Sequence, residues 1–74
     1  MSIRIIDGRM MEPPEPLEQT LEALDTLADD DELLLLLYCQ PHPLYQALRK
    51  NGYVWNDHVC DDGTREIRIR KSVH

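Results

Sequence analysis

The sequence predicts a two-layer α/β sandwich (α+β) in which both helices cover one face of a four-stranded mixed sheet. Three features support this fold: an isoleucine-rich segment at the start, a run of five leucines in the middle, and two alternating segments around an Asp-Asp-Gly turn near the end. The expected order is β-α-β-α-β-β, and right-handed crossovers place both helices on the same face. At 74 residues, the chain is expected to form a single domain, residues 1–74.

The first strand and the first helix follow from side-chain periodicity. Residues 2–6 predict a short strand in which Ile3 and Ile5 share one face. After a proline cluster, leucines recur at helical spacing and predict an amphipathic helix. Three consecutive aspartates oppose the dipole at a helix C-terminus, so we expect this helix to end by Ala28 or Asp29.

The middle of the chain predicts a buried strand and a second helix. Residues 32–38 carry the leucine run between acidic residues and a proline, which favours a strand covered on both faces and parallel to the first. Pro41 restarts the chain into a shorter helix, and Gly52 is a suitable terminator. The expected inward-facing residues of this helix are Leu44, Ala47 and Leu48.

The last part of the chain predicts a β-hairpin made of residues 53–60 and 64–70. Tyr53 and Trp55 are expected to pack against the core or an edge. A patch of basic residues is expected on the open face of the sheet: Arg4, Arg68, Arg70 and Lys71. Such a patch suggests an RNA-binding module as a third-ranked function, although the formal net charge of −6 argues against nucleic-acid binding.

Composition narrows the function classes further. No apolar stretch approaches the roughly 20 residues that a membrane-spanning helix needs, and the first residues lack the basic-then-apolar pattern of a secretory signal. We therefore expect a cytoplasmic protein without a membrane partner. The sequence contains no Ser/His/Asp arrangement and no phosphate-binding glycine loop, and we expect no enzymatic activity and no cofactor.

The segment from Asp7 to Pro16, Asp-Gly-Arg-Met-Met-Glu-Pro-Pro-Glu-Pro, joins the first strand to the first helix. It resembles the signature of the TusA/SirA family of small sulfur carriers, Asp-x-x-Gly-Leu-x-Cys-Pro-x-Pro. Four residues match as they stand: Asp7, Pro14, Glu15 and Pro16. Pro13 stands where that family has its reactive cysteine, and Met10 replaces the glycine.

The resemblance implies a β-α-β-α-β-β scaffold that has lost its sulfur nucleophile. It points to an uncharacterised bacterial branch with Pro-Pro-Glu-Pro at this position, whose relatives occur beside hemerythrin-like and other redox- or iron-related domains. It thus implies a non-catalytic accessory domain, linked to redox, iron or sulfur metabolism, that binds another protein. The expected partner-binding residues are Met10, Met11, Glu12, Pro13, Pro14 and Glu15, in which methionines provide adaptable contacts.

Two cysteines supply the alternatives to this interpretation. Cys39 and Cys60 lack Cys-x-x-Cys spacing and are expected to be free, buried or half-buried thiols. The runner-up function is a thiol or sulfur carrier that uses Cys60 or Cys39, although acidic neighbours of Cys60 should raise its pKa: Asp57, Asp61 and Asp62. A weaker idea joins His58 and Cys60 to Cys39 or His42 in a metal site, but no zinc-type spacing supports it and we expect no metal.

Overall fold

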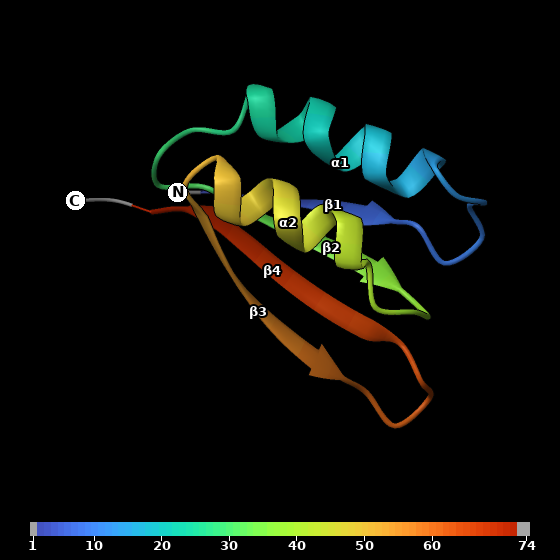
Figure 1. The fold of residues 1–74 in the computed structure, drawn as a ribbon. Coiled ribbons are helices and arrows are strands. Elements are labelled where there is room, and N and C mark those ends of the chain that lie inside the picture. Colours follow the sequence, from blue (N-terminus) through green and yellow to red (C-terminus); the bar gives the residue numbers. More distant parts are fainter. Residues whose placement is uncertain (1, 73–74) are drawn as a thin grey trace.

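A computed structural model describes residues 2–72 and confirms the predicted sandwich. Four strands and two helices follow one another in the expected order β-α-β-α-β-β (Figure 1). Their bounds are β1 Ile3–Asp7, α1 Glu15–Asp25, β2 Glu32–Leu37, α2 His42–Lys50, β3 Tyr53–Val59 and β4 Arg65–Lys71. Within residues 2–72, no helix combines the length and the apolar character that crossing a membrane requires.

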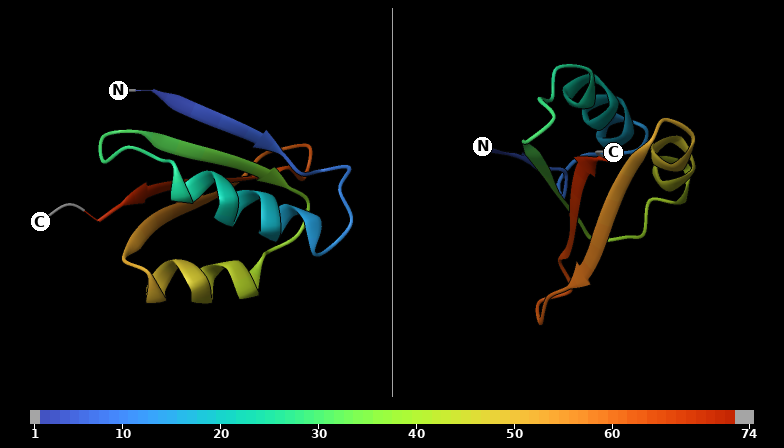
Figure 2. Two further views of the ribbon diagram at one scale, coloured as in Figure 1. Left: turned by 90° about the horizontal axis from the view of Figure 1, so that it is seen from above. Right: turned by 90° about the vertical axis from the view of Figure 1, so that its left-hand side faces the viewer.

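The sheet has the strand order β1-β2-β4-β3 and is mixed. β1 and β2 are parallel, whereas β4 runs antiparallel to both β2 and β3. The two views of Figure 2 show that the sheet is twisted and that α1 and α2 lie on the same side of it. The helices leave the other face open, as the right-handed crossovers predict.

The core lies between the helices and the two central strands. β2 and β4 alternate strictly, so that every second side chain points toward the helices. The fully or nearly fully buried side chains from the two layers are Leu33, Leu35, Leu37, Ile67, Ile69, Leu24, Leu27, Leu44 and Leu48. Leu34 and Leu36 remain half-buried on the open face, which is why the leucine run of β2 is continuous rather than alternating.

The first helix ends within the limit that the sequence predicted, before the run of three aspartates. It ends at Asp25, and the amides of Thr26 and Leu27 donate to the carbonyls three residues earlier, each at 3.2 Å. This tighter final turn satisfies carbonyls that a longer helix would have used. Leu27 is nevertheless buried below it, whereas Ala28 is exposed. The expectation that the helix ends by Ala28 or Asp29 is confirmed.

The predicted four-residue basic patch is wrong, because two of its members lie on the helical side of the sheet. The Arg4 guanidinium reaches α1 and donates to the Thr26 hydroxyl at 3.0 Å. The Lys71 ammonium lies 3.4 Å from a carboxylate oxygen of Asp29. Strand alternation explains both positions, since Arg4 shares its face with Ile6 and Lys71 shares its face with Ile69. Arg68 and Arg70 alone occupy the open face as predicted.

Tyr45 anchors α2 to the hairpin, a role that the sequence did not reveal. Its ring stacks on Trp55 with centroids 5.1 Å apart, and its hydroxyl donates to the carboxylate of Asp57. Arg65 also pairs with Asp57, at 2.7 Å. Burial, reinforced by the hydrogen bond to Asp57, raises the pKa of Tyr45 to about 12. Ala47, predicted to face inward, is half-buried and lines a hollow together with Leu21 and Leu24 of α1.

A matched pair of isoleucines tests this division of the sheet into a core face and an open face. Ile67 is fully buried on β4, whereas Ile5 on β1 is 61% exposed. We expect Ile67→Ala to lower the free energy of unfolding by about 2–5 kcal/mol, through lost burial and a residual cavity. Ile5→Ala should cost about 1 kcal/mol or less. Urea unfolding followed by circular dichroism measures both, and equal losses would contradict the assignment.

Candidate functional site

Two connections meet at one end of the molecule, where β1 and β2 finish and both helices begin (right-hand side of Figure 1). Gly8 follows β1 directly, and its amide donates to the Leu36 carbonyl at 2.8 Å. An added Cβ at Gly8 would lie 2.8 Å from a methyl carbon of Leu37, so a larger residue here would force the Leu37 side chain to shift. The carboxyl ends of parallel strands are where α/β folds commonly bind ligands.

A groove of about 360 Å³ lies between these two connections, and we call it the loop groove. One wall comes from the first connection and the start of α1, the other from the end of β2 and the start of α2. Most of the side chains that line it are apolar, including Met11, Pro13, Pro14, Leu17, Leu37, Pro41 and Leu44. A groove of this size accommodates a few apolar side chains of a binding partner.

The six predicted partner-binding residues divide into two groups around this groove. Met11, Pro13 and Pro14 line it, and the peptide bond that joins the two prolines is cis. Met10 is 90% exposed beside it, with Glu12 and Glu15 also exposed. The predicted segment therefore supplies both an apolar wall and an exposed, partly acidic rim.

The beginnings of both helices are poorly suited to binding an anion. Each has a proline as its N-cap residue, Pro14 for α1 and Pro41 for α2, and neither has a side-chain cap. Each helix also carries a proline in its first two positions. Prolines remove the amide donors that normally make a helix N-terminus attractive to phosphate or carboxylate groups. The loop groove is thus chemically an apolar site.

An ion pair that the sequence reasoning missed holds the start of the first connection. The Arg9 guanidinium lies 2.8 Å from Asp7, and its second hydrogen bond to the same carboxylate is 2.9 Å long. Arg9 also donates to the Thr64 hydroxyl at 3.4 Å, which ties the loop to the start of β4. These hydrogen bonds lower the pKa of Asp7 to about 2. The Asp-x-Arg spacing was the one signal available for this pair.

The two thiols lie in different places. Cys39 is exposed and lines the loop groove, so the expectation of a buried or half-buried thiol was wrong for it. Cys60 is half-buried, and burial raises its pKa, with further contributions from Glu66 and Asp62. The predicted direction of this shift is confirmed. Asp57, expected to contribute, instead faces the helices and bonds to Tyr45.

Three potential metal ligands come together on the open face of the hairpin. The ligand atoms of His58, Cys60 and Glu66 all lie within 4.8 Å of one another. The sequence suggested Cys39 or His42 as the ligand beside His58 and Cys60. Both lie elsewhere, since Cys39 lines the loop groove and His42 begins α2. The sequence alone does not indicate Glu66 as a ligand. Glu66 follows Cys60 across the hairpin turn, and only strand pairing places it opposite His58.

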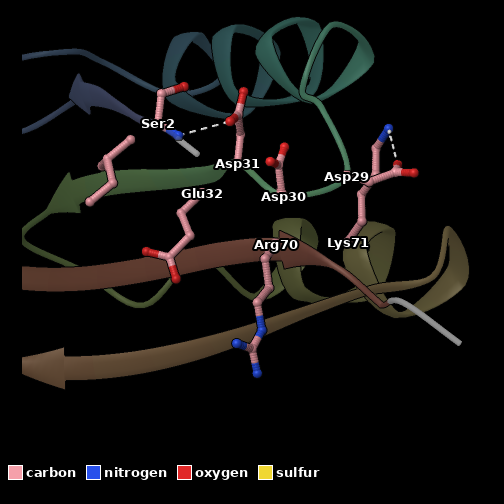
Figure 3. A pocket seen from close by; sticks show the side chains of 8 residues that line it. Ser2, Asp29, Asp30, Asp31, Glu32, Arg70 and Lys71 are labelled. Atoms are coloured by element: carbon pink, nitrogen blue, oxygen red, sulfur yellow. Dashed lines mark hydrogen bonds and ion pairs between the residues drawn. The ribbon is translucent and has the colours of Figure 1, made fainter.

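A hollow of about 710 Å³ at the other end of β1 and β2 is less informative (Figure 3). It is lined largely by the acidic connection between α1 and β2. Asp31 accepts a hydrogen bond from the Ser2 amide at 2.9 Å, and Asp29 pairs with Lys71. Arg70 extends away from the aspartates in Figure 3. Asp29 and Asp31 thus have partners within the protein, and the loop groove remains the stronger candidate site.

The ion pair between Asp7 and Arg9 makes a prediction about pH. The depressed pKa means that the pair stabilises the loop above the ordinary aspartate value of 3.8 and loses this effect as the pH falls toward about 2. In Arg9→Gln, the carboxyl titration of Asp7, followed by NMR, should move up toward 3.8. Asp31, whose pKa is lowered by the Ser2 amide, serves as the internal control and should not move. An unchanged Asp7 titration would contradict the pairing.

A second prediction concerns the relative reactivity of the thiols. With iodoacetamide at neutral pH, Cys39 should be modified first because its side chain is exposed. Cys60 should react more slowly than free cysteine, because it is half-buried and its pKa is raised. Mass spectrometry of Cys39→Ser and Cys60→Ser measures each rate separately. A Cys60 that reacts faster than free cysteine would support the sulfur-carrier alternative instead.

Comparison with known proteins supports a family assignment but supplies no activity. No curated protein and no solved structure matches this chain. Residues 5–71 match a family described as "Uncharacterized conserved protein (DUF2249)". The match extends from β1 to the end of β4 and includes both walls of the loop groove as well as the hairpin. The chain therefore belongs to the DUF2249 family.

Proposed function

We propose that this protein is a non-catalytic accessory domain that binds an apolar segment of another protein in the loop groove. The observation that carries the proposal is the composition of this groove. Its walls consist of prolines and Met11 together with leucines from the adjoining ends of α1, β2 and α2. Exposed apolar surface rimmed by polar residues is typical of protein-binding sites. Flexible methionine side chains adapt to such partners.

Charge around the groove suggests what kind of segment it would accept. Glu12 and Glu15 are exposed at the rim, and the helix beginnings offer few amide donors to an acidic group. Complementary charge directs association more than it raises affinity. A partner segment with apolar residues flanked by lysine or arginine would fit both features.

The resemblance of the Asp7–Pro16 segment to TusA/SirA signatures supports a role without covalent chemistry. A proline at position 13 has no thiol and cannot form a persulfide, whereas the same loop in a sulfur carrier presents one. A cytoplasmic location and a link to redox, iron or sulfur metabolism belong to this proposal. A hemerythrin-like or other redox- or sulfur-related partner also belongs to it.

One observation favours a second candidate function, a thiol or sulfur carrier. Cys39 is exposed and lines the same groove in which a partner would bind, so a bound protein could reach its sulfur. Cys60 fits this role less well because its pKa is raised. RNA binding has less support still, since Arg4 and Lys71 point away from the open face.

Two pairs of apolar residues, one in the loop and one on the open sheet face, allow a controlled test of docking. Met11 is half-buried, and the other three are exposed. Met10→Ser, Met11→Ser changes the loop, and Ile3→Ser, Ile5→Ser changes the open sheet face to a similar extent. Partners captured from the native host by the parent chain should be lost with the methionine variant and kept with the isoleucine variant. NMR shift mapping with one purified partner should then place its contacts in the loop groove. Retention of every partner by the methionine variant would remove the docking proposal.

A further inference from the structure

The hairpin brings three chemically different side chains to one small area of the open face. His58 and Cys60 are two residues apart at the end of β3 and project to the same side. Glu66 of β4 is the direct cross-strand partner of His58. One nitrogen, one sulfur and one carboxylate oxygen therefore lie within 4.8 Å of one another.

This donor set suits a particular class of metal ion. Imidazole and thiolate ligands favour zinc and related transition metals over magnesium or calcium. Zinc is bound by sulfur at about 2.3 Å and by nitrogen or oxygen at about 2.0–2.2 Å, which places neighbouring ligands of a tetrahedral site roughly 3.3–3.7 Å apart. The present separations of up to 4.8 Å exceed this range, so the proposed site requires side-chain rotations that bring the ligand atoms closer together.

The surroundings of the three ligands favour a bound cation. A hollow of about 360 Å³ adjoins Cys60 and Glu66, and Asp61 and Asp62 also line it. Arg9 lines the same hollow, but its charge is compensated by Asp7. Arg68, on the same face of β4, pairs with Glu32 at 3.3 Å. The guanidinium groups of Arg9 and Arg68 are thus each paired with a carboxylate. The carboxylates of Asp61 and Asp62 add negative charge that attracts a metal cation.

The backbone of the hairpin holds the ligands in place. The Cys60 amide donates to the Thr64 carbonyl at 2.7 Å, and the Gly63 amide donates to the Cys60 carbonyl at 3.0 Å. Gly63 has a φ of +88°, which glycine adopts at little cost. β3 and β4 are paired up to the turn, so regular backbone pairing fixes the positions from which the three ligand side chains project.

We propose that His58, Cys60 and Glu66 form a binding site for Zn²⁺ or a similar divalent transition metal. Three protein ligands leave the fourth tetrahedral position to water or to an incoming donor, and the adjoining hollow gives such a donor access. The site lies on the open face, whereas the loop groove lies on the helical side. Arg9 lines both the adjoining hollow and the loop groove, but none of the three proposed ligands lines the groove. The metal proposal does not rest on the docking function proposed above.

Cobalt provides a direct probe, because Co²⁺ replaces Zn²⁺ and reports its ligands by absorption. We expect the reduced full-length chain to bind one Co²⁺ with a near-ultraviolet band from thiolate-to-metal charge transfer, and added Zn²⁺ to displace it. Cys60→Ser should abolish the band. His58→Ala and Glu66→Gln should each weaken binding by more than about 100-fold, beyond the effect of losing an outer-shell partner.

Matched variants separate this site from adventitious binding. Cys39→Ser and His42→Ala remove the same chemical groups elsewhere in the chain and should leave the cobalt spectrum and affinity unchanged. Circular dichroism of each variant confirms that the fold is retained. No charge-transfer band with Co²⁺ in excess would overturn the proposal. A band that survives Cys60→Ser and disappears in Cys39→Ser would overturn it equally.

Discussion

The register between β2 and β4, in which Leu35 lies opposite Ile67, determines what each face of this sheet can do. Side chains alternate between the faces of a strand, and a shift of one residue would exchange them all. In the observed register, the leucines and isoleucines at alternate positions meet the helices and form the core. The remaining side chains of the same strands, among them Glu66, are directed to the open face.

The parallel pairing of β1 and β2 has a second consequence, because it brings two connections to one end of the sheet. Each parallel strand is followed by a chain reversal into a helix, and both reversals are rich in proline. Proline keeps these segments from extending the helices and withholds their amide donors. Two adjacent proline-rich reversals therefore produce an apolar groove. Glycine-rich reversals at the same place would instead offer backbone amides to a phosphate.

Tyr45, Asp57 and Arg65 connect the helical layer to the inner face of the hairpin. Tyr45 stacks on Trp55 and bonds to Asp57, which fixes α2 over β3. Arg65 joins the same carboxylate from β4. The inner face of the hairpin thus belongs to the core, and its outer face carries His58, Cys60 and Glu66. The proposed metal ligands and the loop groove therefore use different side chains.

The sequence by itself determined the order of the elements, the parallel placement of the leucine-rich strand and the glycine-terminated turns. The order and the turns depend on local periodicity and on proline and glycine geometry, which act within a few residues. The parallel placement was predicted from the continuous leucine run, which is typical of a strand covered on both faces. The sequence also indicated six partner-binding residues, of which Met11, Pro13 and Pro14 line the groove. Only the tertiary structure decided that Arg4 and Lys71 lie on the helical side of the sheet and that Tyr45 is buried. It alone placed Cys39 in the groove and Glu66 beside His58, because those neighbours are created by strand pairing and helix packing between residues distant in the chain.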